Sequence, residues 1–531
     1  MGENREEIEM IILGLGGILG DAACALLRDG ELVAAIEEKK VERHRIPGGL
    51  PETSAAECLK LAGVSPAQVD CVALVRPISF GPASALHLEL RAMFPNARLA
   101  LVEHHMAHAA SVYYVSGFDS ATVLTLDRGG DFRCGARWHA EGNEIRIDQE
   151  MYYPDSLGDL FGRVTELLGF EPRSEEHKVQ WLSTEGDESL LPLFREILSA
   201  NTTLVDRSYL DDDRAGAGGF GFKFYDRIGV EDGSAIPPSQ RAAIARGVQA
   251  AVEEKVLEIA GEGENLCLAG GLFYNALLVA AIEQSGRWKN VIVQPVAGNA
   301  GTSIGAVLYA WHSVYGQTKR AKLGDLCLGP SATPDEVKEV LENCKLRFRY
   351  LMTTDELIAE AMRRIGGDQI VAWMQGRMEF GPRALGNRSI LASPKNPYST
   401  ENLNNYIKRR ESFRKFAASV PAEVAGEYFE TTPNARYIAT VSRVRLGHRK
   451  TFEPAVMGRD YVRVQVVERT DNPLYHRLLC AAGEASGLPV LYNTSFNLFG
   501  DPLVCRPRDA VRSFYSSGID ALFCGNFLVE K

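Results

Sequence analysis

The sequence lacks the features that mark several common classes of protein. Lysine and arginine number 58 against 69 aspartates and glutamates, which gives a net charge of −11. A nucleic-acid-binding protein needs a basic surface, so this balance argues against nucleic acid as the main partner. No apolar run is long enough to span a bilayer, and the first ten residues are acidic, unlike a signal peptide. We therefore expect no membrane segment and a cytoplasmic protein.

Closely spaced cysteines are missing as well. The ten cysteines are scattered and form no CxxC pair. This distribution is typical of reduced thiols in a cytoplasm, where each cysteine is a small core residue rather than a ligand or a nucleophile. The remaining composition is ordinary for a globular protein, with 45% hydrophobic and 24% charged residues over 531 positions. That length predicts two or three domains.

Residues 376–389, GRMEFGPRALGNRS, combine glycines with arginines in one short stretch. They follow an apolar run at residues 369–373 that predicts a buried strand. Glycine lets backbone N–H groups approach a ligand closely, and arginine forks match phosphate oxygens in bidentate fashion. The stretch therefore predicts a site for a compact anion. Taken alone, it fits a solvated turn with surface arginines equally well.

Two later stretches favour the anion site. Residues 408–416, KRRESFRKF, are strongly cationic, and residues 492–497, YNTSFN, place hydroxyls and amides after the apolar run at 488–491. Open α/β sheets bind ligands where strands end in this way. The three stretches together resemble the C-terminal half of the carbamoyltransferases of the nodulation and antibiotic-tailoring type. The resemblance is close at GRMEFGPRALGNRSIL and YNTSFN, and it extends along essentially the whole chain.

A pattern of strand, glycine turn and strand occurs twice in the first part of the chain. It occupies residues 11–36 and recurs at residues 121–147, around the glycine turn at 127–131. The resemblance implies that these are the two β-hairpin units of an actin-like ATPase fold. The expected fold class is α/β, with an actin-like lobe at 1–350 and a YrdC-like twisted α/β lobe at 351–531. Thr333 is predicted to cap a helix that starts at Pro334.

A second glycine pair follows a predicted strand at residues 266–269. Gly270 and Gly271 end this strand, and a helix is predicted from about Asn275. A nucleotide phosphate or ribose near a helix N-terminus is one explanation of this element. A close crossing of the strand and the helix is the structural alternative, which we weigh as the weaker of the two.

His104 and His108 are four residues apart, so on a helix they share one face and can bind one metal ion. Asp127, at the end of the next strand, can add a carboxylate. An HxxxH pair without other context is more often a pair of ordinary helix histidines. The resemblance implies that His104, His108 and Asp127 hold a divalent metal, commonly Fe²⁺.

The chain departs from the family's pattern in the first lobe. The family has a histidine immediately before the aspartate that matches Asp21, where this chain has Gly20, and glycine cannot act as a base. Asn299 stands where the family has an aspartate, and an amide oxygen is the weaker ligand. Arg45 replaces a lysine, and residues 175–178, EEHK, replace a glycine-containing turn.

The resemblance also implies the residues that bind the substrates. Carbamoyl phosphate is a small dianion and carbamate an unstable anion, so holding both requires several fixed cations and donors in a site closed to water. The predicted catalytic residues are Arg383, Lys408, Arg463, Ser495 and Asn497. The predicted cofactor-binding residues are Asp21, Arg45, Gly129, Gly130, Lys178, Gly270, Gly271, Asn275 and Arg388.

The function implied is O-carbamoyl transfer in two stages, with ATP, Mg²⁺ and carbamoyl phosphate, to a small-molecule acceptor. The resemblance leaves open a homodimer or a pairing with a paralogue. The alternative is a divergent member whose first lobe, with Gly20 and Asn299, uses a non-hydroxyl acceptor, only forms the adenylate, or is a non-catalytic partner subunit. An amine acceptor needs less help from a base than an alcohol does.

Overall fold

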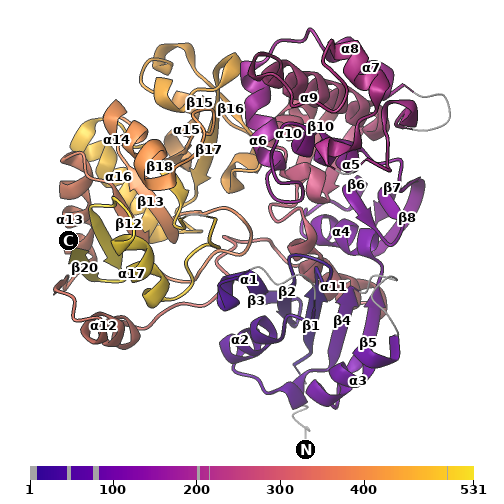
Figure 1. Cartoon of the computed structure of the whole chain (residues 1–531). Coiled ribbons are helices and arrows are strands. Elements are labelled where there is room, and N and C mark those ends of the chain that lie inside the picture. The colour runs from indigo at the N-terminus through magenta and orange to yellow at the C-terminus, as the bar shows by residue number, and fades with distance from the viewer. Residues whose placement is uncertain (1–8, 45–48, 76–82, 200–203, 215, 499) are drawn as a thin grey trace, which may run out of the picture.

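The computed structural model describes residues 9–531 except 45–48, 76–82, 200–203, 215 and 499. The chain forms two lobes, and the second lies beside the first as the orange and yellow part of Figure 1. Both lobes combine helices with sheets, so the predicted α/β class is confirmed. No helix in the described part of the chain is both long and apolar enough to cross a membrane. All ten cysteines are free thiols.

The first lobe contains two sheets of five strands with the same topology. Each begins with an antiparallel meander of three strands, and the first strand of the meander also pairs in parallel with a fourth strand that leads to a fifth. The sheet orders are β3-β2-β1-β4-β5 and β8-β7-β6-β9-β10. This duplication is the actin-like arrangement that the two sequence units predict. The strands are β1 (Ile11–Gly16), β2 (Ala23–Arg28), β3 (Glu31–Glu37), β4 (Cys71–Val75), β5 (Arg98–Val102), β6 (Ser120–Gly130), β7 (Arg133–Glu141), β8 (Glu144–Tyr152), β9 (Gly263–Ala269) and β10 (Trp288–Val293).

Helices α4 and α11 pack against each other near the middle of the first lobe (Figure 1). Their contact requires Gly305, because a Cβ there would overlap the carbonyl oxygen of Ala107. The close crossing fixes α4, and with it the two histidines at its start. The helices of this lobe are α1 (Glu38–Glu42), α2 (Glu52–Ala62), α3 (Ala83–Met93), α4 (His104–Tyr113), α5 (Leu157–Leu167), α6 (Glu176–Leu182), α7 (Leu191–Ile197), α8 (Phe222–Ile228), α9 (Pro238–Ala260), α10 (Ala276–Gln284) and α11 (Thr302–Tyr309).

The second lobe is built on a mixed sheet of ten strands, in the order β11-β20-β19-β12-β13-β18-β14-β17-β16-β15. The strands are β11 (Phe348–Tyr350), β12 (Val371–Met374), β13 (Arg388–Ala392), β14 (Ala417–Pro421), β15 (Phe429–Glu430), β16 (Ser442–Val444), β17 (Tyr461–Val467), β18 (Leu491–Ser495), β19 (Ala521–Cys524) and β20 (Phe527–Glu530). The helices are α12 (Pro334–Asn343), α13 (Thr354–Gly366), α14 (Pro397–Asn402), α15 (Ala425–Tyr428), α16 (Pro473–Ser486) and α17 (Pro507–Tyr515).

Residues before 350 already pair and pack with the second lobe. Strand β11 pairs with β20, and Val337 and Leu341 of α12 belong to the core of the second lobe. Thr333 caps that helix as predicted, with Pro334 as its first residue, and Thr333 and Glu336 form a capping box. We therefore propose a boundary just before α12.

The loop at 376–389 is held against the first lobe. Lys40 donates to the carbonyl oxygens of Glu379 and Gly381, at 2.9 and 2.5 Å, and Glu37 accepts from the backbone N–H of Gly381 at 3.0 Å. Lys40 and Glu37 are buried and paired with each other. A buried ion pair that also bonds to the backbone gives the loop one fixed position relative to the first lobe.

Candidate functional site

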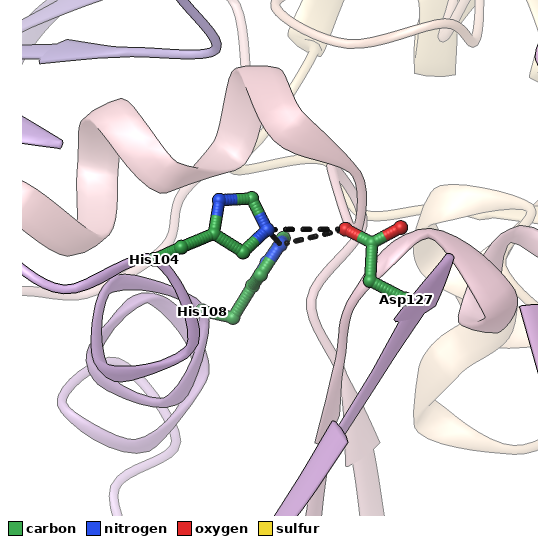
Figure 2. Close-up of side chains that lie close together, drawn as sticks. All are labelled: His104, His108 and Asp127. Carbon is green, nitrogen blue, oxygen red and sulfur yellow. Dashed lines mark hydrogen bonds and ion pairs between the residues drawn. The ribbon is translucent and has the colours of Figure 1, made fainter. Parts of the chain in front are cut away.

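A cluster of two histidines and one aspartate lies where α4 meets the end of β6 (Figure 2). His104 Nε2 and His108 Nε2 lie 3.3 and 3.2 Å from Asp127 Oδ2, and 3.2 Å from each other. These three residues offer one ligand atom each within a sphere that suits a metal ion. The helical spacing of four predicts the histidine pair, and the strand end predicts the carboxylate.

The dimensions of this cluster fit a first-row divalent ion. A tetrahedral site with metal–ligand bonds of about 2.0–2.1 Å has ligand atoms about 3.3–3.4 Å apart. The three donor–donor distances of 3.2–3.3 Å match one face of such a tetrahedron. Imidazole and carboxylate ligands suit Fe²⁺ and Zn²⁺. His108 Nδ1 is buried and has no hydrogen-bond partner in the described part of the chain, so that ring lacks the usual outer support.

The electrostatics of the cluster also favour a cation. Burial disfavours the carboxylate of Asp127, yet the hydrogen bonds from the two histidines hold its pKa well below the usual value. Burial lowers the pKa of His108 despite Asp127. Burial opposes the charged form of His104 too, but the hydrogen bond and charge of Asp127 outweigh it, so that pKa is raised. The cluster thus keeps the carboxylate of Asp127 ionised and His108 in the neutral form that binds a metal ion.

The glycines predicted to approach a nucleotide instead make room for this cluster. A Cβ on Gly130 would overlap the ring of His104, and one on Gly271 would lie 2.9 Å from Asp127 Oδ1. Gly270 has φ of +102°, and a Cβ there would overlap the backbone of Leu126. Gly270 is therefore required by its close approach to strand β6, and not by the crossing of strand and helix that we considered as the alternative. A Cβ on Gly129 would lie 3.8 Å from the ring of Tyr153, which is ordinary contact, so of these four glycines Gly129 is the one with room for a side chain.

Three further predicted cofactor-binding residues form hydrogen bonds or ion pairs with other residues of the protein. Asn275 caps α10 by accepting from the backbone N–H of Leu278, and its amide pairs with Gln249. Asp21 accepts from Lys39 at 2.7 Å. Lys178 forms ion pairs of 2.6 and 2.8 Å with Glu175 and Glu411. Of the other two, Arg45 lies outside the described residues, and Arg388 is described below.

The predicted residues Arg383, Lys408, Arg463, Ser495 and Asn497 of the second lobe lie around a group of cations, which we call the cation cluster. Lys408 holds its polar side chains in place. Its ammonium group donates to the carbonyl oxygens of Ser495 and Asn497, at 2.9 and 2.8 Å, and to Asn497 Oδ1 at 2.8 Å. Ser495 Oγ donates to the same Asn497 oxygen at 2.7 Å. Burial, followed by the charges of Arg410 and Arg414, lowers the pKa of Lys408 well below its usual value. Lys408 therefore shapes the end of β18, where the sequence predicts a ligand.

Two guanidinium groups of the cluster are left without a carboxylate. Arg383 forms no hydrogen bond or ion pair with the described part of the chain, and Arg463 leaves its buried Nε without a partner. Burial and then the neighbouring arginines lower the pKa of Arg463 well below its usual value, and that of Arg383 is also lowered, chiefly by burial. An entering anion would relieve both the desolvation and the repulsion.

Arg388 lies apart from this cluster. It is fully buried, and its two terminal nitrogens donate to main-chain carbonyls, including those of Gln375 at 2.6 Å and Pro330 at 3.2 Å. Glu379 accepts from three backbone N–H groups of the same loop. Arg388 is thus part of the framework of the loop at 376–389, and we propose a positioning role for it rather than ligand contact.

Sequence reasoning missed several residues that face the cation cluster. Arg410 and Arg414 come from the cationic stretch at 408–416, whose charge was the signal available. Burial, with the charge of Arg414, lowers the pKa of Arg410 to about 9. His177 and Trp181 on α6 reach the cluster from the first lobe, and the ring of Trp181 lies 5.4 Å from the guanidinium of Arg463. No local signal marks a contact between residues so far apart in sequence.

Two of the departures in the first lobe, Gly20 and Asn299, lie next to each other. Asn299 Nδ2 donates to the carbonyl oxygen of Gly20 at 3.3 Å. A Cβ on Gly20 would have no atom within 4 Å, so the position is open to a side chain. An aspartate at 299 could not donate this hydrogen bond. The pair therefore forms one altered corner of the first lobe.

Known sequences match this chain over most of its length. The family described as Carbamoyltransferase N-terminus matches residues 83–308, and Carbamoyltransferase C-terminus matches residues 362–531. Nodulation protein NolNO of Sinorhizobium fredii is 31% identical over 96% of this chain and 79% of that protein. An uncharacterized protein of Synechocystis sp. is 32% identical over 98% of this chain and 96% of its own. The 3'-hydroxymethylcephem-O-carbamoyltransferase of Amycolatopsis lactamdurans is 31% identical over 51% of this chain and 49% of that enzyme.

Proposed function

Because the chain belongs to the carbamoyltransferase family, we propose that it uses carbamoyl phosphate and ATP to carbamoylate a small-molecule acceptor through carbamoyladenylate. The observation that carries this proposal is the half-buried cation cluster of the second lobe. Arg383 and Arg463 lie there beside Arg410 without a balancing carboxylate of their own. Such a set suits phosphate oxygens, which accept several charge-assisted hydrogen bonds at once.

The proposed reaction has two stages. Water releases phosphate from carbamoyl phosphate and leaves carbamate, whose oxygen attacks the α-phosphorus of ATP and expels pyrophosphate. The acceptor then attacks the carbonyl carbon of carbamoyladenylate, AMP leaves, and the acceptor proton is lost. Mg²⁺ bound with ATP would neutralise charge on the leaving pyrophosphate. The cations of the cluster stabilise charge that develops on phosphate oxygens, and excluding bulk water from the site would protect the carbamate.

In the first lobe, we propose that His104, His108 and Asp127 hold Fe²⁺ or another divalent ion. Such an ion would supply Lewis acidity for the transfer step. Asp127 keeps its negative charge for the cation, since the two histidines hold its pKa well below the usual value. Gly130 and Gly271 leave the ligands room.

The direct test of the proposed function needs no acceptor. Wild-type protein is incubated with ATP, Mg²⁺ and carbamoyl phosphate, and pyrophosphate is measured. We expect release that depends on carbamoyl phosphate. Absence of release, with the protein folded by circular dichroism, would contradict the adenylating activity and leave a non-catalytic partner subunit as the explanation.

The altered corner supports a second candidate, transfer to an acceptor other than a hydroxyl. Gly20 offers no base, and Asn299 is bonded to its carbonyl. We predict that Gly20→His increases transfer to a hydroxyl acceptor by roughly tenfold, less than the 10²–10⁴ of a well-positioned base. The open space at this position accommodates the ring. The probe is 3'-hydroxymethylcephem, and the product is quantified by mass spectrometry.

Gly20→Ala is the matched control for this substitution, because it adds a side chain without a base. We expect it to leave hydroxyl transfer at the wild-type level. Equal gains in both variants would mean that side-chain volume matters, and no gain in either would mean that this corner does not limit the transfer.

A further inference from the structure

Helix α6 brings His177 from the first lobe to the cation cluster of the second. The next residue, Lys178, forms an ion pair of 2.8 Å with Glu411. The ring of Trp181, four residues after His177, lies 5.4 Å from the guanidinium of Arg463. Residues four apart share one face of a helix, so His177 and Trp181 point toward the same side. The ring of His177 therefore faces the junction between the two lobes.

The imidazole of His177 is held neutral by its surroundings. Burial, followed by the charges of Arg414, Arg383 and Lys178, lowers its pKa to about 3. Nε2 is buried and has no hydrogen-bond partner in the described part of the chain. A neutral imidazole beside cations is more stable with a lone pair toward them than with an N–H toward them, so we assign Nε2 as the acceptor.

This acceptor stands out because its surroundings consist of donors. Guanidinium and ammonium groups offer N–H donors and no acceptor, which suits the oxygens of a phosphate or a carbonyl. Two carboxylates lie at this junction, and both are paired with cations: Glu175 with Lys178, and Glu411 with Lys178 and Arg414. The carbamoyl NH₂ has two N–H donors, and no cation can satisfy them. A buried acceptor without a partner is costly, and an N–H from the substrate removes that cost.

We propose that His177 is a specificity residue, whose Nε2 accepts a hydrogen bond from the NH₂ group of the carbamoyl donor. This inference rests on the proposed function, because it concerns the donor used there. It explains how a site rich in cations distinguishes carbamoyl phosphate from acetyl phosphate. The two share the phosphate and the carbonyl, and differ in NH₂ against CH₃. A site built to bind an N–H group discriminates strongly against an analogue that lacks it.

The experiment compares the two donors in wild type and in His177→Phe. Pyrophosphate release with ATP is measured as a function of carbamoyl phosphate and of acetyl phosphate, and the ratio of the two kcat/KM values is taken. Phenylalanine fills the space of the imidazole without an acceptor. We expect the preference for carbamoyl phosphate to fall on the order of tenfold to hundredfold. A general loss of packing would lower both values and leave the ratio unchanged.

His177→Gln tests the same idea by rescue. Its side-chain oxygen can take the place of Nε2, so we expect much of the preference to return. A ratio unchanged from wild type in the phenylalanine variant would overturn the inference while leaving the proposed function intact. If the wild type releases no pyrophosphate with carbamoyl phosphate, the proposed function fails first, and the inference fails with it.

Discussion

Replacing Arg383 by alanine is expected to lower carbamoyl-phosphate-dependent pyrophosphate release on the order of 10²–10³-fold, the usual effect of losing one preorganised electrostatic contact. Arg383 is the residue of choice because it serves no structural partner. It forms no hydrogen bond or ion pair with the described part of the chain, and burial already lowers its pKa. Its removal should cost little stability, since a buried, unpaired charge is itself unfavourable. The loss should therefore appear in the rate and not in the fold.

Arg347→Ala provides the matched control for Arg383→Ala. Arg347 is an exposed arginine of the same lobe, so its loss changes the net charge equally. Release at the wild-type rate is expected there, and circular dichroism should be unchanged in both variants. If Arg383→Ala retained wild-type release while folded, the anion site would have to be sought elsewhere than in this cluster.

The strongest sequence signals for the fold were periodic or repeated. The two strand–turn–strand units predicted the duplicated sheets, and the helical spacing of His104 and His108 predicted two side chains on one face. The signal for the helix start at Thr333 was also local, because an N-cap bonds to a residue only three positions along the chain. Sequence patterns of this kind predict contacts well, because both partners belong to the same helix or strand and their spacing fixes their relative positions.

The roles of single polar residues were harder to predict. Asn275 and Arg388 have the chemistry of ligand-binding residues, yet the structure uses one to cap a helix and the other to hold main-chain carbonyls. Gly130 and Gly271 were predicted to approach a nucleotide, and in the structure they lie against the side chains of His104 and Asp127. His177 gave no local signal, because its importance comes from packing one lobe on the other. Apart from the cap made by Asn275, which is a local contact, these outcomes depend on contacts between distant segments.

The effect of the glycine turn at 127–131 on the cluster of His104, His108 and Asp127 can be tested with two neighbouring substitutions. A Cβ on Gly130 would overlap the ring of His104, whereas one on Gly129 would meet only Tyr153 at 3.8 Å. Neither glycine has a positive φ, so alanine fits the backbone at both positions. Gly130→Ala must therefore move His104, and the face of three donor atoms 3.2–3.3 Å apart is lost.

We expect Gly130→Ala to weaken divalent-metal affinity by about 10–100-fold, as loss of a ligand's immediate support does, while Gly129→Ala binds like the wild type. Binding of Fe²⁺ under anaerobic conditions and of Zn²⁺ is measured by titration, with metal analysis of each purified protein. Pyrophosphate release should be unchanged in both variants, because the cation cluster of the second lobe does not touch Gly130. Equal metal binding in all three proteins would mean that His104 is not a ligand. Equal weakening in both variants would mean that the turn as a whole, rather than the space for the His104 ring, controls the site.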